Sequence, residues 1–224
     1  MLSDIFVITS VINTGYRPWS YTSQRSCYTK DERFNQTLET IQSIRKLNDN
    51  SKILLVECSD IDDKMTHILQ NSVDYFIQTY NIDEVRNACL ESNKKGFGEI
   101  KKLQIACDYI SKNNIQFNRL FKISGRYFLN SFFDKNRYVF DKFTFKMYYH
   151  DCGSTVLYSV PFSLFQLYIE KLNSTSKFYE ENGPYGIEQL IPTSCYPRHD
   201  ISTLGVSGYV AVTNDKGISE FYTA

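Results

Sequence analysis

The N-terminal stretch Ile5-Phe6-Val7-Ile8-Thr9-Ser10 carries the clearest fold signal in the sequence. Its first four residues form a continuous apolar run, which is typical of a parallel strand covered on both faces. Similar runs occur in Lys52–Val56, Val73–Ile77 and Arg119–Ile123. Together they predict four strands of one parallel sheet.

Helical patterns separate the first three of these strands. In Asp31–Leu47, apolar residues recur at helical spacing after a candidate cap at Thr29 or Lys30, and Asp62–Gln70 is a second, shorter helix. The order strand-helix-strand-helix-strand indicates an α/β fold with right-handed crossovers. A third helix is expected over Glu99–Lys112, before the fourth strand.

The second half of the chain has a different pattern. Tyr138–Tyr149 is aromatic and partly alternating, which favours antiparallel strands. The rest predicts a strand, two helices and short terminal strands, at Thr155–Val160, Pro161–Leu172, Ile187–Ile191 and Gly205–Tyr222. A Gly/Pro turn at residues 182–186 precedes the second helix. No linker is visible, so we expect a single domain over residues 1–224, with both halves joined in one mixed sheet.

Composition excludes several classes of protein. Lys+Arg and Asp+Glu are both 25, so net charge gives no reason to expect nucleic acid as a partner. Six scattered cysteines form no CxxC motif and no zinc spacing. The chain shows no secretory signal and no apolar run long enough for a membrane helix, so we expect a cytoplasmic protein. The oligomeric state is open.

Polar residues follow three of the expected strands and are the candidate site. They are Thr9 and Ser10 after the first strand, Glu57 and Asp60 after the second, and Ser124, Gly125 and Arg126 after the fourth. Ligands of open α/β sheets bind beyond the carboxyl ends of the strands, where these residues would meet. The GxGxxG fingerprint of dinucleotide-binding proteins is absent after the first strand.

Each candidate has a ligand chemistry and an ordinary structural alternative. The carboxylate of Glu57 or Asp60 suits a ribose or a base edge, but Glu57 can equally be a helix cap or a solvated carboxylate. Arg126 can pair with a phosphate, or it can form a structural ion pair. Arg25, in the long polar loop from Asn13 to Lys30, can close over the same phosphates or be a plain surface charge. Glycines in Lys94–Glu99, before the third helix, either approach an anion or form an ordinary cap.

Several stretches resemble bacterial and large-virus sequences assigned to glycosyltransferases of the GT-A fold. The similarity runs over most of the chain and is carried by Arg25-Ser26-Cys27-Tyr28, Glu32–Leu38, Lys122-Ile123-Ser124-Gly125-Arg126-Tyr127 and Ser154–Ser159. The resemblance implies a nucleotide-diphospho-sugar donor, bound by residues 1–127, and a glycan acceptor, bound by residues 128–224.

One departure from that family concerns the metal. GT-A enzymes usually carry Asp-x-Asp after the fourth strand to hold a divalent ion on the diphosphate, and here that place reads Ser124-Gly125-Arg126. The only similar string, Asp60-Ile61-Asp62-Asp63, follows the second strand, where we interpret it as a helix cap. We therefore expect no metal ligands and leave the divalent ion open. Arg126, Lys122 and Arg25 are the cations that would stabilise the leaving group.

Transfer with inversion also needs a base near the acceptor hydroxyl. Glu188, at the start of a short helix, is the first candidate, and Asp151, after the aromatic strand, is the second; His150 and His199 are further possibilities. A first-turn glutamate is also simply favourable for a helix dipole. Two alternatives to a glycosyltransferase stay open. One is a non-catalytic glycan- or protein-binding module on the same fold, and the other is a sugar-nucleotidyltransferase.

Overall fold

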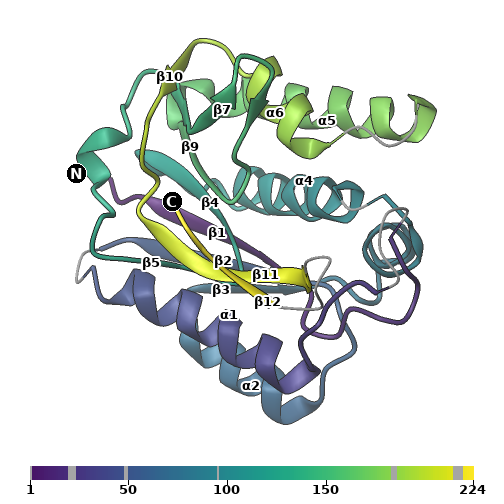
Figure 1. Cartoon of the computed structure of the whole chain (residues 1–224). Helices are drawn as coiled ribbons and strands as arrows, with labels where there is room; N and C mark the ends of the chain where they lie inside the picture. Colours follow the sequence, from purple (N-terminus) through teal and green to yellow (C-terminus); the bar gives the residue numbers. More distant parts are fainter. Residues whose placement is uncertain (1, 20–23, 48–49, 95, 183–185, 214–218) are drawn as a thin grey trace.

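The computed structural model describes residues 2–19, 24–47, 50–94, 96–182, 186–213 and 219–224. One seven-stranded sheet takes strands from both halves of the chain, in the order β10-β6-β9-β4-β1-β2-β3 (Figure 1). Its strands are β1 (Ile5–Ser10), β2 (Lys52–Glu57), β3 (Tyr75–Gln78), β4 (Arg119–Ser124), β6 (Phe143–Phe145), β9 (Leu157–Pro161) and β10 (Arg198–Asp200).

The direction of the strands changes between the two halves. Strands β4, β1, β2 and β3 are parallel to one another. Strand β9 pairs antiparallel with both β4 and β6, and β10 returns parallel to β6. The predicted α/β fold, mostly parallel in the N-terminal half and extended by antiparallel strands in the C-terminal half, is confirmed.

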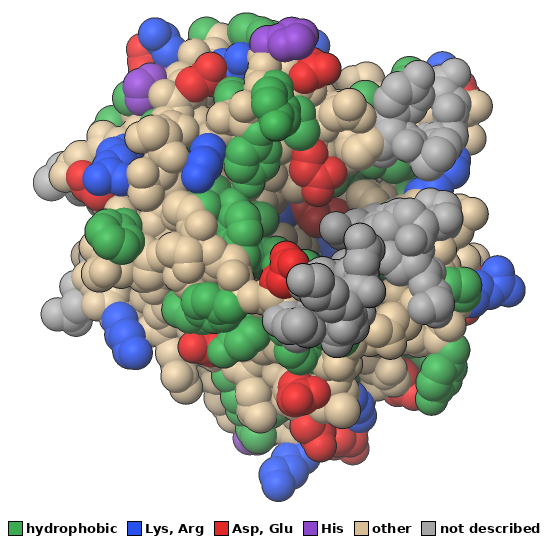
Figure 2. Space-filling model, in the orientation of Figure 1, with side chains coloured by type: hydrophobic (Ala, Val, Ile, Leu, Met, Phe, Trp, Pro, Cys, Tyr) green, Lys and Arg blue, Asp and Glu red, His purple; other side chains and the backbone are tan. Residues whose placement is uncertain are grey.

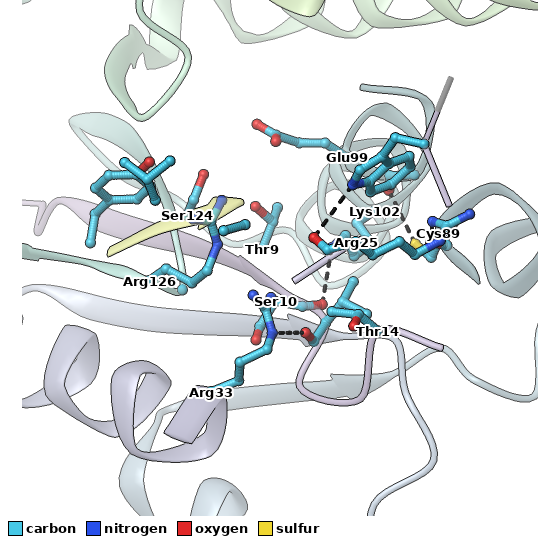
Figure 3. A pocket seen from close by; sticks show the side chains of 17 residues that line it. Thr9, Ser10, Thr14, Arg25, Arg33, Cys89, Glu99, Lys102, Ser124 and Arg126 are labelled. Carbon is cyan, nitrogen blue, oxygen red and sulfur yellow. Dashed lines mark hydrogen bonds between the residues drawn. The ribbon is translucent and has the colours of Figure 1, made fainter. Parts of the chain in front are cut away.

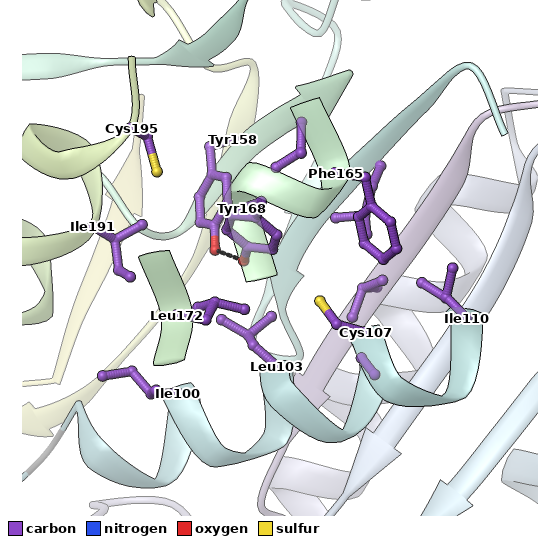
Figure 4. Close-up of a cluster of buried hydrophobic side chains, with 14 of the residues drawn as sticks. Ile100, Leu103, Cys107, Ile110, Tyr158, Phe165, Tyr168, Leu172, Ile191 and Cys195 are labelled. Atoms are coloured by element: carbon purple, nitrogen blue, oxygen red, sulfur yellow. Dashed lines mark hydrogen bonds between the residues drawn. The ribbon is translucent and has the colours of Figure 1, made fainter. Parts of the chain in front are cut away.

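Helices cover both faces of this sheet (Figure 1). Helices α1 (Lys30–Arg45) and α2 (Asp63–Ser72) cover one face, and α4 (Phe97–Lys112), α5 (Phe165–Asn182) and α6 (Ile187–Ser194) cover the other. Strand β1 shows why its sequence is uniformly apolar. Phe6 and Ile8 pack into the cluster under α1, while Ile5 and Val7 pack into the cluster under α4 and α5. Figure 4 shows the second cluster, in which Leu103 and Ile110 of α4 meet residues of α5 and β9.

Helix α1 begins where the sequence indicates. The Glu32 backbone N–H donates to Thr29 Oγ1 at 3.3 Å, and the Thr29 N–H donates to Glu32 Oε2 at 2.7 Å. This reciprocal capping box satisfies two N–H groups that a helix start leaves without partners. Because the cap fixes the first turn, it also fixes the point on the helix from which the Arg33 side chain extends.

Other boundaries differ from the sequence-based expectation. The expected strand Val73–Ile77 starts two residues later, at Tyr75, because the Asp74 carboxylate accepts a hydrogen bond from the Ile53 N–H at 2.9 Å. Residues 138–149 hold only the short strands β6 and β7 (Met147–Tyr149). The helix expected to end at Leu172 continues to Asn182 as α5. Of the turn expected at 182–186, residues 183–185 lie outside the described residues.

Two smaller sheets and several short helical segments lie beside these layers, among them the 3-10 turns Lys135–Arg137 and Phe162–Leu164. Strands β5 (Tyr127–Leu129), β11 (Val206–Thr213) and β12 (Ser219–Thr223) form an antiparallel sheet, and β7 pairs with β8 (Cys152–Gly153). Helix α3 (Asp83–Arg86) and the π-helical turn η1 (Asn87–Glu91) lie between β3 and α4. Together, β11, η1 and the loop after β1 surround the carboxyl ends of β1 and β4.

Candidate functional site

A cavity of about 140 Å³ lies at the carboxyl ends of β1 and β4 (Figure 3). It is small beside the ~300–1,000 Å³ of ordinary ligand pockets, so it has room for part of a ligand only. The space-filling view shows a hollow on this face of the molecule (Figure 2). The lining residues that matter below are Thr9, Ser10, Arg25, Arg33, Glu99, Lys102, Ser124, Gly125 and Arg126.

The turn between β4 and β5 brings two predicted strand ends together. The Gly125 N–H donates to the Thr9 carbonyl at 3.0 Å, and the Gly125 carbonyl accepts from Thr37 Oγ1 at 3.1 Å. A Cβ at Gly125 would lie 3.0 Å from the Cβ of Ser10. A side chain at this position would push Ser10 and Thr37 aside by a few tenths of an ångström, so glycine favours the close approach of this turn to β1. Arg126 follows at the cavity wall.

The Arg126 side chain makes few contacts with the rest of the described chain. One Nη1–H donates to the Tyr209 carbonyl of β11, and the guanidinium carbon lies 5.2 Å from the Tyr127 ring centroid. No hydrogen bond from its Nη2 to a described residue is present. Much of the Arg126 fork is thus available to a ligand.

Arg25 lines the cavity but uses its guanidinium to anchor the long loop. Its N–H groups donate to the carbonyls of Arg17, Cys89 and Ser92, the second at 2.7 Å. The guanidinium also stacks on Trp19, 3.9 Å from the ring centroid. Burial lowers the pKa of Arg25. This side chain fixes the loop between β1 and α1 against η1.

Sequence reasoning missed two basic residues of the cavity, Arg33 and Lys102. Arg33, in the first turn of α1, donates from Nε to the Val11 carbonyl at 2.7 Å. Lys102, on α4, donates from Nζ to the Ser10 carbonyl at 3.0 Å. Both side chains are buried. The sequence did contain a signal for both residues. Each is a charged residue on the face of a helical stretch that packs against the sheet.

Burial and the neighbouring Arg126 lower the pKa of Arg33 to about 9. Two positive groups that close together disfavour each other's charge. The buried Glu57 carboxylate offsets part of this effect, since it acts to raise the same pKa. Arg33 still carries its charge at neutral pH, two units below that value.

The charge on the cavity wall is unbalanced. Arg25, Arg33, Lys102 and Arg126 face one carboxylate, Glu99. That carboxylate forms an ion pair with Lys122, which lies outside the lining. Among the described residues, no ion pair involves any of the four basic groups. The cavity therefore favours an anionic ligand.

Three of the residues predicted to bind the donor do not line the cavity. The Glu57 carboxylate is fully buried and accepts hydrogen bonds from the Ile12 N–H at 2.9 Å and from the Ser59 hydroxyl, so it holds the start of the long loop. Asp60 is exposed. Lys122 is buried and donates to Glu99, Ser124 Oγ and the Thr155 carbonyl. Burial lowers its pKa.

Gly96, just before α4, and Gly98, in its first turn, have a packing explanation. A Cβ at Gly98 would lie 2.7 Å from the Cα of Cys89, and one at Gly96 would lie 2.8 Å from the Cβ of Ile187. Helix α4 can therefore approach η1 and α6 only with glycine at these positions. Its first turn also carries Glu99, which disfavours an anion there.

The acidic string after β2 is a helix cap. Asp62 Oδ1 accepts from the Met65 N–H at 2.9 Å at the start of α2, and its other oxygen lies 3.5 Å from Lys30 Nζ. In the described part of the chain, no group of three or more His, Cys, Asp or Glu is arranged to hold a metal ion.

The two candidate bases, Glu188 and Asp151, both lie near Cys152 and outside the basic wall. Glu188, in the first turn of α6, is close enough to act on the pKa of Lys122. The pKa of Tyr179 is raised first by burial and then by Glu188 and Glu99. Asp151 is exposed in the turn after β7, and both carboxylates, after burial, raise the pKa of Cys152. Neither is among the lining residues, nor are His150 and His199.

Comparisons with known proteins give structural similarity only. No family model matches the sequence, and no curated protein matches it. One similar structure is a nucleoside-diphosphate-sugar pyrophosphorylase from Vibrio cholerae RC9, at TM-score 0.46 and 10% identity over 90% of this chain and 93% of that one. Another is a candidate nucleotide-diphospho-sugar transferase from Desulfovibrio desulfuricans G20, at TM-score 0.42 and 6% identity over 87% and 74%.

A third similar structure is a glycosyltransferase involved in the glycosylation of the major capsid of PBCV-1, at TM-score 0.44 and 12% identity over 89% of this chain and 82% of that one. Identities this low concern the fold alone, and TM-scores below 0.5 mark a distant similarity. None of the described helices combines the length and apolarity needed to cross a bilayer.

Proposed function

We propose that this chain is a glycosyltransferase that moves one sugar from a nucleotide-diphospho-sugar to a hydroxyl group of a glycan. The observation that carries the proposal is the excess of positive charge in a cavity at the carboxyl ends of β1 and β4. This edge of an α/β sheet is where ligands bind. A diphosphate is the anionic part of such a donor, and it is also the leaving group.

The chemical step is a displacement at the anomeric carbon. The acceptor oxygen forms a bond to that carbon while the bond from the carbon to the diphosphate oxygen breaks. The nucleoside diphosphate leaves with the electron pair, and the acceptor proton passes to a carboxylate base. Positive groups beside the leaving oxygen stabilise the charge that develops there. The part of the Arg126 fork that is available at the cavity wall supports this role for Arg126.

We assign the base to Glu188. It lies in the first turn of α6, in the C-terminal half of the chain, and is close enough to Lys122 and Tyr179 to act on their pKa values. Asp151 remains the second candidate. In this arrangement the donor diphosphate lies among the basic groups, and the acceptor approaches from the side of α6 with inversion at the anomeric carbon.

Calorimetric titration with UDP, GDP, TDP and CMP, each with and without Mn²⁺, tests the donor site. Selective binding of one nucleotide is expected, followed by sugar release or transfer from the matching nucleotide sugar. Arg126→Ala should remove this binding while the fold survives. Arg137→Ala, which changes an exposed arginine outside the cavity, is the matched control. Failure of all four nucleotides to bind would favour a non-catalytic module.

Glu188→Gln tests the assignment of the base. Transfer is expected to fall about 10²- to 10⁴-fold, the usual contribution of a general base, with nucleotide binding unchanged. Glu181→Gln, at an exposed glutamate near the end of α5, is the control. Full activity of Glu188→Gln together with loss of activity in Glu99→Gln would transfer the role to Glu99.

A further inference from the structure

The divalent ion implied by the GT-A resemblance does not fit the residues of this cavity. Mg²⁺ and similar ions take oxygen ligands, above all carboxylates. Here the place of the Asp-x-Asp motif holds Ser124, Gly125 and Arg126, and four basic groups surround it. The one lining carboxylate, Glu99, already pairs with Lys122. A divalent cation would enter a site whose charge repels it.

Arg33 and Arg126 form the centre of this positive site. They come from different elements, α1 and the turn after β4, and Figure 3 shows both at the ends of the strands. Arg33 is buried, and Arg126 is close enough to lower its pKa. Holding two guanidinium groups together in a buried place is unfavourable unless an anion joins them.

Other buried cations of the chain have carboxylate partners. Arg119 pairs with Asp4 at 2.9 Å, Lys101 pairs with Glu180 at 3.0 Å, and Lys122 pairs with Glu99. The cavity is therefore an exception within this molecule. Its basic groups donate to backbone carbonyls and one hydroxyl, which orient them without neutralising them.

The available donors match a diphosphate. Among the described residues, no hydrogen bond is made by Nη2 of Arg33 or Nη2 of Arg126. Lys102 Nζ makes one bond, to the Ser10 carbonyl, and keeps further N–H groups. Guanidinium forks bind phosphate oxygens in pairs. The volume of about 140 Å³ is too small for a whole nucleotide sugar and suits its charged centre.

We propose that Arg33 and Arg126, together with Lys102 of α4, bind the diphosphate of the donor in place of a divalent cation. This inference rests on the proposed function for the identity of the ligand, but the anion site itself can be measured separately. Arg33 is the new element. It takes the part of the leaving-group site that Lys122 and Arg25 cannot supply, because those two side chains are committed to internal contacts.

The test uses inorganic pyrophosphate as the probe, titrated in EDTA and again with Mn²⁺. Wild-type protein should bind pyrophosphate equally well in both conditions. Arg33→Gln and Arg126→Gln should each weaken binding about 10- to 100-fold, the effect of losing charge-assisted hydrogen bonds. Arg33→Lys should recover part of the loss. Arg45→Gln, on the same helix but ion-paired with Asp74 outside the cavity, should bind as wild type does.

Two results would overturn the inference: pyrophosphate binding that requires Mn²⁺, or unchanged affinity in Arg33→Gln. The melting temperature of each variant without ligand guards against misfolding. Arg126→Gln removes only one internal side-chain hydrogen bond and should melt near the wild type. UDP, GDP and TDP titrated in EDTA separate the two proposals. Binding of pyrophosphate without any nucleoside diphosphate sustains the anion site and refutes the proposed donor. Nucleoside diphosphate binding that is unchanged in Arg33→Gln sustains the proposed donor and refutes the role of Arg33 in the anion site.

Discussion

Basic side chains lie at both ends of strands β1 and β4, but only those at one end pair with a carboxylate of the chain. At the start of the strands, Arg119 of β4 meets Asp4, which precedes β1, at 2.9 Å, and Lys135 joins the same carboxylate at 3.1 Å. At the other end of the strands, Arg33 and Arg126 have no carboxylate partner among the described residues. Both sites are basic and at least partly buried, so the difference lies in whether the chain supplies the anion.

This difference separates a structural role from a binding role. A buried ion pair that is complete within the chain joins parts of the fold, and removing one partner leaves an uncompensated charge. Buried basic groups without such a partner instead lower the free energy of any anion that enters. Burial of a basic group does not distinguish a structural role from a binding role. The presence or absence of a carboxylate partner does.

The largest effect is expected at the paired end. Asp4→Ala should lower the free energy of unfolding by about 3–5 kcal/mol, because Arg119 and Lys135 lose the same buried carboxylate. Urea unfolding followed by circular dichroism measures this. Asp141→Ala, at an exposed aspartate, is the control. A loss below 1 kcal/mol would mean that the two ends differ less than their ion pairs suggest.

The sequence was sufficient for the parallel sheet because each of its strands is locally marked by an apolar run. It was also sufficient to bring Thr9, Ser10 and Arg126 to one edge, since that follows from strand direction. It could not separate Arg25 and Lys122 from Arg33 and Lys102. Whether a cation is committed to a carbonyl, paired or available depends on contacts between residues far apart in the chain, such as Arg25 with Cys89.

Glu57 illustrates the same limit. Its position after β2 favoured a contact with a ribose or a base, but its carboxylate accepts hydrogen bonds from Ile12 and Ser59. The end of a strand places a residue near the site without deciding which way its side chain turns. The short helices α3 and η1 were not predicted, because helices of four and five residues offer too few positions for a helical period.

A smaller effect is expected from pH at the unpaired end. Arg33 must be protonated to bind an anion, and its pKa is lowered to about 9. Pyrophosphate affinity should therefore be independent of Arg33 ionisation below about pH 8 and should fall as pH rises through 9. A bound anion raises this pKa, so the fall ends at a higher pH in the complex.

Calorimetry between pH 7 and 10 measures this dependence. The ratio of wild-type to Arg33→Gln affinities isolates the contribution of Arg33, because the ionisation of pyrophosphate is common to both proteins. We expect the ratio to fall by about tenfold over this range, as one positive charge is lost. A constant ratio would show that Arg33 keeps its charge throughout or takes no part in binding.

The smallest effect is expected for stability at the unpaired end. Arg126→Gln removes one of two neighbouring positive charges and one hydrogen bond, to the Tyr209 carbonyl. The loss of the bond costs about 1 kcal/mol and the relief of repulsion opposes it, so the free energy of unfolding should change by less than about 1 kcal/mol. Urea unfolding without ligand measures this change, beside the same measurement on Asp4→Ala. A destabilisation as large as that of Asp4→Ala would make Arg126 a structural residue. A negligible change in the free energy of unfolding, together with the loss of pyrophosphate binding, would show that Arg126 carries its charge for a ligand. A charge that an anion needs for binding, and that does not stabilise the fold, has no structural role.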